Sequence, residues 1–397
     1  MAKSIFEIPN QVKNVPSNYR NWSASSLNEI EECPKRYFLK NSDYPTIWAR
    51  KGFPNRISAP QIKGLVIHSV VSRFVKCIRD YDIVFETFIV DYLKSNGGYM
   101  KILKDVIEEE LSKCAKNPRA EAQIPSIRDA LWSDLSEIRS QVQYFVKQSI
   151  TRYGEFGPLR SKSRASGHAS QGLEINSINS EFRIVDVEHK IEGYLDLLIT
   201  NEANHHILDY KSSKTISDQY WSQLSLYAWL WNRDSRNKAK GNCTIEIVSG
   251  SGISESRTIR ELEFDEISKN VLSRIEKANL ARESGFAEAR QSDTNCRFCP
   301  VKMLCDPYWK VNEETFGEDV WLDLRIKIIG NVGGNSWKVQ LLADGSNAIL
   351  VVGDRDDGSI KKDQELRILS AYMKNDEESG QIIRLTKNSE IFRVAAN

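Results

Sequence analysis

The sequence lacks several features that would assign it to a membrane, a secretory route or a charged partner. No apolar run approaches the roughly 18 residues needed to span a bilayer, and residues 1–15 lack the compact apolar stretch of a secretory signal. The 55 Lys and Arg residues nearly balance the 54 Asp and Glu residues, so the formal net charge is only +1. We therefore expect a cytoplasmic protein with no membrane partner. A nucleic-acid partner cannot be argued from overall charge.

Cysteine is scarce as well, with seven in 397 residues. In a cytoplasmic protein, so few thiols predict metal ligation or simple burial rather than a set of disulfides. Cys77, Cys114 and Cys243 lie inside expected helices or strands, where a thiol behaves as a small apolar side chain. The remaining four cysteines have an informative spacing, which is described below.

The length predicts more than one domain, because a single hydrophobic core usually stops growing before 397 residues. Hydrophobic content of 40% and charged content of 27% are typical of soluble globular proteins. Helical patterns dominate the first part and strand patterns follow, so we expect an α/β fold. The composition becomes β-rich from about residue 316, which predicts two domains, 1–315 and 316–397.

Apolar periodicity predicts helices at 25–40 and 60–80, the first opened by serines that can cap it. Residues 81–152 are mostly helical, with breaks near Asn96-Gly97-Gly98 and Asn117-Pro118. A segment rich in Ser, Gly and Arg, 154–172, predicts a loop.

A central sheet is expected at about 173–264. Its strands are predicted at 182–188, 193–200, 206–211, 244–248 and 258–264. Helices are predicted between and after them, at 216–231 and 265–284.

The C-terminal part predicts a small closed barrel, because it packs five or six short strands into few residues. These strands are expected at 320–329, 337–342, 348–352, 365–371, 382–385 and 391–394. Their number and spacing fit an oligonucleotide/oligosaccharide-binding (OB) barrel and also an SH3-like barrel. Two acidic loops, at 354–357 and 376–378, would repel phosphate, so docking of a protein fits as well as binding of nucleic acid.

Two acids and a lysine form a pattern that suits metal chemistry. Gly193-Tyr194-Leu195-Asp196 and Asp209-Tyr210-Lys211 lie on expected strands joined by a short polar turn. Adjacent antiparallel strands would bring Asp196 and Asp209 together, and two carboxylates at one point attract a hard divalent cation. Asp209 and Lys211 face the same way on a strand, so the amine could position or help deprotonate an attacking water.

These segments resemble the RecB-like branch of the PD-(D/E)XK nucleases. In that family a Gly-x-x-x-His helix, a Gly-x-x-Asp strand, an Asp-x-Lys strand and a Gln-x-x-x-Tyr helix recur in this order. Here 64–68 supplies the first motif, and Gln223 and Tyr227 supply the last. The resemblance implies a mixed central sheet flanked by helices, with a helical N-terminal insertion at about 61–152. It also implies a phosphodiester hydrolase that depends on Mg²⁺ or Mn²⁺.

The resemblance also implies roles for single residues. His68, Asp196, Asp209 and the backbone carbonyl of Tyr210 would bind the metal, and Lys211 would be the catalytic lysine beside the two aspartates.

Gln223 and Tyr227 would support this site and the DNA backbone, and Glu181, on the preceding strand, matches a further acidic position. Taken singly, each motif is more common as an ordinary solvated or packed feature; only their order and placement favour the nuclease. Leu195 stands where the name of the family has a proline.

Four cysteines are spaced to hold one inorganic centre. Cys296, Cys299 and Cys305 form a C-x2-C-x5-C run, and Cys33 lies far upstream. One cysteine before the nuclease core and three after it resemble the iron–sulfur staple of AddB-type and CRISPR-adaptation nucleases, which implies a [4Fe–4S] cluster. The spacing alone leaves zinc open, because four thiolates also form tetrahedral zinc sites.

The sequence thus favours a metal-dependent deoxyribonuclease acting on single-stranded DNA or DNA ends. The chain has no G-x-x-x-x-G-K-[ST] run and hence no P-loop motor of its own, so a helicase or another protein could dock through the C-terminal barrel. Two alternatives stay open: a non-catalytic DNA-binding subunit of a larger complex that uses a nuclease-like scaffold, and an RNase.

Overall fold

The structure is a computed structural model. It describes residues 5–9, 21–80, 85–156, 177–201, 204–213, 215–237, 241–285, 287–311, 320–353, 358–376, 380–386 and 388–395. The predicted loop 154–172 lies outside this part except for its first three residues, which end a helix, and so do the acidic segments 354–357 and 377–378. Every helix in the described part is too short or too polar to cross a bilayer.

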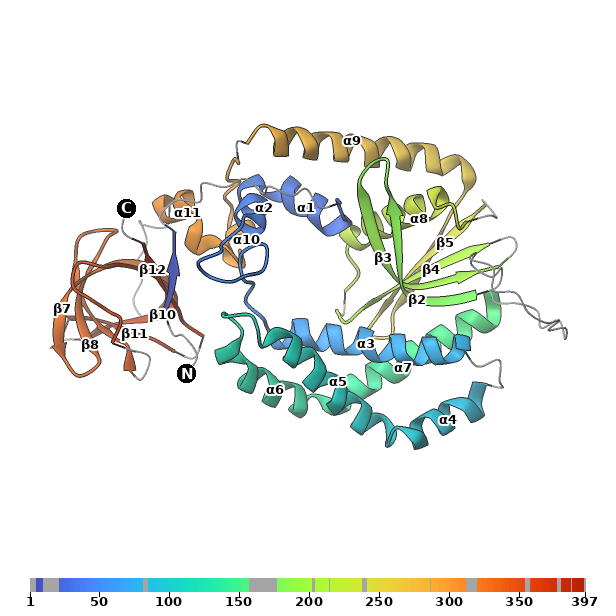
Figure 1. The fold of residues 1–397 in the computed structure, drawn as a ribbon, viewed down its shortest axis with the longest axis horizontal. Helices are drawn as coiled ribbons and strands as arrows, with labels where there is room; N and C mark the ends of the chain where they lie inside the picture. The colour runs from blue at the N-terminus through green and yellow to red at the C-terminus, as the bar shows by residue number, and fades with distance from the viewer. Residues whose placement is uncertain are drawn as a thin grey trace.

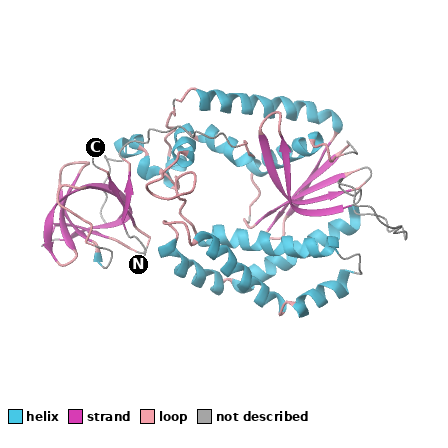
Figure 2. Ribbon diagram, viewed as in Figure 1, coloured by secondary structure: helices cyan, strands magenta, loops and turns pink. Residues whose placement is uncertain are grey.

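The larger part of the molecule is a five-stranded mixed sheet between two helical layers (Figures 1 and 2). The strand order is β2-β3-β4-β5-β6, antiparallel except for the parallel pair β4 and β5. The strands are β2 (Ser177–Asp186), β3 (Ile191–Thr200), β4 (His205–Lys211), β5 (Cys243–Ser249) and β6 (Ser254–Ile259). The predicted fifth strand, 258–264, is thus wrong in its bounds, because Glu261–Glu263 form a 3-10 turn.

The two faces of the sheet bury separate hydrophobic cores. On one face, Leu197, Leu208 and Tyr210 pack with apolar residues of the long helices. Those helices are α3 (Ala59–Asp80), α5 (Gly98–Cys114), α6 (Ile124–Ser133) and α7 (Leu135–Phe156), and α4 (Phe85–Ser95) lies beside α5. They form the predicted helical insertion, with its breaks at the expected places. This arrangement fixes α3 across the sheet.

On the other face, Leu198 and Ile207 pack with the remaining helices of this part. These are α1 (Ala24–Glu32), α8 (Asp218–Arg233) and α9 (Phe264–Glu283), and α9 is drawn above the sheet in Figure 1. The sheet therefore lies between α3 and α7 on one side and α8 and α9 on the other.

The single helix predicted at 25–40 is wrong, because the structure breaks it at Cys33. Helix α1 ends at Glu32 and α2 (Pro34–Asn41) begins directly afterwards, with Cys33 in an extended conformation, φ −157° and ψ 100°. Proline disfavours a helical conformation in the residue before it and is well tolerated at the first position of a helix. Pro34 therefore ends one helix and starts the next.

The C-terminal strands form a second sheet that closes on itself. All six predicted strands are present: β7 (Val320–Gly333), β8 (Ser336–Leu341), β9 (Asn347–Val351), β10 (Glu365–Asp376), β11 (Gly380–Arg384) and β12 (Glu390–Val394). The order runs β7-β8-β9-β11-β10, and β10 pairs back with β7. Only β9 and β11 are parallel within this ring.

The N-terminal segment joins this second sheet. Strand β1 (Ile5–Ile8) pairs in parallel with β12, and Ile5 packs into the barrel core. A boundary at residue 316 therefore assigns β1 to the wrong part. Between the two parts lie three short segments, α10 (Asp293–Arg297), η3 (Lys302–Leu304) and α11 (Asp306–Val311).

Candidate active site

Asp196 and Asp209 lie where strands β3 and β4 separate. The two strands are paired from Leu197 and Leu208 to Thr200 and His205. Beyond the Leu197–Leu208 pair, the backbone N–H of Tyr210 donates to Oδ2 of Asp196 over 2.8 Å. The carboxylate thus takes up a donor that the neighbouring strand leaves free, which fixes its position at the end of the ladder.

His68 reaches this carboxylate from helix α3. Its Nδ1 lies 3.2 Å from Oδ1 of Asp196. Glu181 arrives from β2, where its φ of 50° is in the left-handed region that a residue with a side chain rarely adopts. His68, Glu181 and Asp196 each offer one possible ligand atom, and these three atoms lie within 4.8 Å of one another. One imidazole nitrogen and two carboxylate oxygens thus converge from three elements.

Lys211 and Asp209 form the neighbouring half of the site. The Nζ of Lys211 lies 2.6 Å from Oδ2 of Asp209 and donates to Oε1 of Gln223 over 3.4 Å. Gln223 in turn donates to the hydroxyl of Tyr227 over 2.8 Å. Gln223 and Tyr227 are one turn apart on α8, so this helix holds the lysine from the face of the sheet that it covers.

The aromatic ring of Tyr220 completes the surroundings of the lysine. Nζ of Lys211 lies 4.7 Å from the centre of that ring, a distance at which a cation is attracted to the ring face. Tyr220 is not part of the Gln-x-x-x-Tyr motif, so the motif did not identify it. Its spacing of three residues from Gln223 places both on one face of α8, and this spacing could have identified it.

The charges of the site act on one another as a single group. Burial lowers the pKa of His68, but the Asp196 carboxylate outweighs it and raises that pKa to about 9. Burial and the charge of Asp196 raise the pKa of Asp209 to about 6. Two close carboxylates cannot both keep their ordinary values, and a bound cation relieves such repulsion.

The lysine is held in its charged form. Burial lowers the pKa of Lys211, but the carboxylates of Asp209 and Asp196 outweigh this and raise it above its ordinary value. The site therefore presents an ammonium group beside the acids.

The predicted site residues are thus brought together, with two differences in the contacts. Glu181, predicted only as a further acidic position, belongs to the group of three close ligand atoms, whereas Asp209 faces Lys211. For Tyr210, the N–H contacts Asp196, and the carbonyl stays a predicted metal ligand. The Tyr210 ring is buried on the opposite face, where its hydroxyl lies 2.7 Å from that of Ser149.

The four spaced cysteines also meet, although they come from distant parts of the chain. Cys33, Cys296, Cys299 and Cys305 line one small cavity beside α2. The break between α1 and α2 places Cys33 at the N-cap of α2, where its sulfur accepts from the N–H of Arg36. Cys296 lies on α10, Cys299 lies in the turn after α10, and Cys305 directly follows η3.

The comparisons agree with this architecture. The family model of the PD-(D/E)XK nuclease superfamily matches residues 21–306, and the chain belongs to this superfamily. Its members are nucleases that typically use divalent metals. The match covers both helical layers, the five-stranded sheet and all four of the spaced cysteines.

Solved structures show weaker similarity. The p204 HINb domain has 9% identity and a TM-score of 0.18 over 21% of this chain and 44% of that one. A complex of fission yeast Pot1 with single-stranded DNA has 10% identity and a TM-score of 0.18 over 27% and 47%. The chain spans less than half the length of these two. A candidate exonuclease from Eubacterium rectale has 9% identity and a TM-score of 0.35 over 76% and 91%. No curated protein matches the chain.

Proposed function

We propose that this protein is a metal-dependent deoxyribonuclease that hydrolyses phosphodiester bonds in single-stranded DNA or at DNA ends. The observation that supports it most is the convergence of His68, Glu181 and Asp196 beside the pair of Asp209 and Lys211. A module that only binds DNA has no physical need for a lysine buried against two carboxylates.

The donor set fits Mg²⁺ or Mn²⁺. Carboxylate oxygens are the ligands that hard divalent cations prefer, and an imidazole nitrogen is well accepted by manganese. His68, Glu181 and Asp196 would hold the ion, with Asp209 on the adjacent strand as a further ligand. When bound, a divalent ion supplies Lewis-acid stabilisation of the phosphate and lowers the pKa of a water molecule.

The chain's own residues orient the reaction. Lys211 is charged and held by Asp209, Gln223 and the Tyr220 ring, so it can position the attacking water and stabilise negative charge that develops on the phosphate. Gln223 and Tyr227 act as positioning residues, because they contact the lysine or each other from helix α8.

The closed C-terminal sheet supports an OB-like barrel. Its ring order, β7-β8-β9-β11-β10, and its single parallel pair describe a small five-stranded barrel. We propose that it assists recognition of DNA or docks a helicase or another protein.

The four cysteines are proposed to hold a [4Fe–4S] cluster. Cys33, Cys296, Cys299 and Cys305 line one cavity, which supports a single inorganic centre held by all four thiols. One cysteine before the nuclease core and three after it resemble the iron–sulfur staple, so we favour the cluster over a zinc ion.

Metal analysis distinguishes an iron–sulfur cluster from a zinc ion at this site. Anaerobically purified protein should be brown and contain iron, and Cys33→Ser should reduce the iron content. Cys243→Ser is the matched control, because Cys243 is a buried thiol outside this cavity. Stoichiometric zinc without iron would refute the cluster and leave the nuclease proposal standing.

The enzymatic proposal is tested with three labelled DNA substrates, linear single-stranded, linear duplex and circular, in Mg²⁺ and in Mn²⁺, and with a labelled RNA beside them. We expect cleavage of the linear single strand that stops when the metal is chelated. Binding of all three substrates without hydrolysis in either metal would instead support a non-catalytic subunit, and cleavage confined to RNA would support an RNase.

A further inference from the structure

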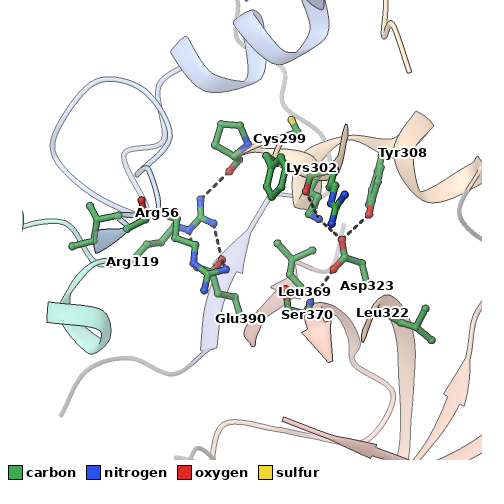
Figure 3. A pocket seen from close by; sticks show the side chains of 15 residues that line it. Arg56, Arg119, Cys299, Lys302, Tyr308, Leu322, Asp323, Leu369, Ser370 and Glu390 are labelled. Atoms are coloured by element: carbon green, nitrogen blue, oxygen red, sulfur yellow. Dashed lines mark hydrogen bonds and ion pairs between the residues drawn. The ribbon is translucent and has the colours of Figure 1, made fainter. Parts of the chain in front are cut away.

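A cavity of about 700 Å³ lies where the nuclease part meets the barrel. Figure 3 shows Arg56, Arg119 and Glu390 on one side of it and Lys302 and Asp323 on the other. These residues come from the loop before α3, the loop after α5, strand β12, η3 and strand β7. Its size is within the range of pockets that bury one small organic ligand.

Both carboxylates in the cavity wall already have partners. Glu390 accepts two hydrogen bonds from Arg119, at 2.9 and 3.0 Å. Arg119 is buried and also donates to the carbonyls of Pro54 and Pro300, so this ion pair joins segments of both parts. Such a buried, fully bonded pair is a fixed part of the wall.

Both carboxylate oxygens of Asp323 also have partners. Its Oδ2 lies 2.5 Å from Nζ of Lys302 and accepts from the hydroxyl of Tyr308 over 2.6 Å. Its Oδ1 accepts from the backbone N–H of Ser370 over 2.8 Å. Asp323 therefore offers no unmet acceptor to a ligand.

The cavity carries a surplus of positive charge. Four cationic side chains, Arg56, Arg119, Arg297 and Lys302, line it against two carboxylates, a difference of two charges. Arg119 and Lys302 are taken up by the two carboxylates. Arg56 lies 3.9 Å from Glu390, whose oxygens already accept from Arg119, and its Nε faces the side-chain oxygen of Gln123 at 3.1 Å. Arg297 has no ion pair with a carboxylate in the described part of the chain. The guanidinium of Arg297 and the outer nitrogens of Arg56 therefore remain for an anion.

An exposed aromatic ring lies beside this surplus charge. Phe298 also lines the cavity, is 82% exposed, and has the guanidinium of Arg297 5.3 Å from the centre of its ring. Phe298 lies between Cys296 and Cys299, so the cysteine cavity on one side fixes the segment that presents the ring. An aromatic face next to guanidinium groups matches the two chemical halves of a nucleotide, a flat base and an anionic phosphate.

We propose that this cavity binds one nucleotide of a single-stranded DNA substrate, with the base stacked on Phe298 and the phosphate bound by Arg297 and Arg56. The inference rests on the proposed nuclease function and names a substrate site of that enzyme away from Asp196 and Lys211. In this proposal the segment from Cys296 to Cys299 helps to hold the single-stranded DNA.

The test measures binding of a fluorescein-labelled oligothymidylate by anisotropy, using the full chain with Asp209→Asn to prevent cleavage. Phe298→Ala removes the ring on which the base stacks, so it should raise the Kd by roughly tenfold. Phe298→Trp should restore binding, and Arg297→Ala should weaken it and reduce its salt dependence. The matched control is Trp132→Ala, another exposed ring beside a cation, Lys104, which should leave the Kd unchanged.

A Kd unchanged by both Phe298→Ala and Arg297→Ala, or the absence of oligonucleotide binding, would overturn the inference. A mononucleotide that competes as well as the oligomer would overturn the assignment to a strand. In parallel, cleavage of the same oligonucleotide is measured with the chain that keeps Asp209. Oligonucleotide binding that depends on Phe298, without any cleavage, would contradict the proposed enzyme and support the nucleotide site. Cleavage with Phe298-independent binding would contradict the nucleotide site alone.

Discussion

The ring of Tyr227 lies so close to Gly193 that a β-carbon on residue 193 would be 2.6 Å from Cε1 and 2.9 Å from Cδ1 of the tyrosine. Real side chains essentially never come so close, so only glycine permits this packing. Because Tyr227 accepts from Gln223, which contacts Lys211, the glycine of the Gly-x-x-Asp motif helps to place the lysine on the next strand.

Gly193→Ala should therefore lower nuclease activity as well as stability. The added methyl group displaces a buried ring, and overpacking of this kind costs about 1–3 kcal/mol. Cleavage rates and thermal unfolding of the purified variant measure both effects. Gly64→Ala is the control, because its β-carbon would meet only Oγ of Ser212, at 3.8 Å, and alanine favours the helix. Equal activity of the two variants would contradict this role of Gly193.

Glu181 should contribute to metal affinity. Its carboxylate belongs to the close group with His68 and Asp196, and its left-handed φ of 50° is a strained conformation of the sort found at functional sites. Glu181→Gln should weaken Mn²⁺ binding on the order of tenfold in a calorimetric titration. Glu192→Gln, whose carboxylate contacts Arg183 and Asn21 outside the site, should bind as the wild type does. Unchanged affinity of Glu181→Gln would remove Glu181 from the ligand set.

A buried carboxylate away from the site should make stability depend on pH. Glu246 on β5 contacts His206 of β4, Arg152 of α7 and Ser254 of β6. Burial alone would raise its pKa, but the hydrogen bonds from His206 and Arg152 outweigh this and lower the pKa from 4.5 to about 2.

Because the pKa of Glu246 is lower in the folded state, its carboxylate contributes to the free energy of unfolding. That contribution is complete above about pH 4.5 and is lost as the pH falls toward 2. Glu246→Gln should thus lower the free energy of unfolding at pH 7 by up to about 3 kcal/mol, and the difference from wild type should shrink in acid. Urea unfolding at several pH values measures it. A difference that stays constant from pH 7 to pH 3 would contradict this assignment.

Periodicity and motif order predicted the parts of the fold that depend on local pattern. The Asp196 and Asp209 strands, the α8 helix and all six C-terminal strands lie close to their expected bounds. The break at Cys33 could also be predicted from the sequence, because Pro34 disfavours a helical conformation in the residue before it. It was missed because the apolar spacing continues across the proline.

Contacts between distant segments could not be predicted from local pattern. The pairing of β1 with β12 joins the two ends of the chain, and four residues give little periodicity. The expected strand 206–211 includes His206, but its burial against Glu246 of β5 depends on a contact between distant segments. The place of Glu181 beside His68 likewise depends on how α3 crosses the sheet, which no spacing encodes.

The measurement that tests the central claim most directly is cleavage of end-labelled single-stranded DNA in Mn²⁺ by wild-type protein and by Asp196→Ala, Asp209→Ala and Lys211→Ala. Circular dichroism and iron content show whether each variant keeps its fold and its cluster. The proposed roles predict that each substitution lowers the rate on the order of a hundredfold or more with the fold intact. Metal-dependent cleavage at the wild-type rate by all three folded variants would contradict the site.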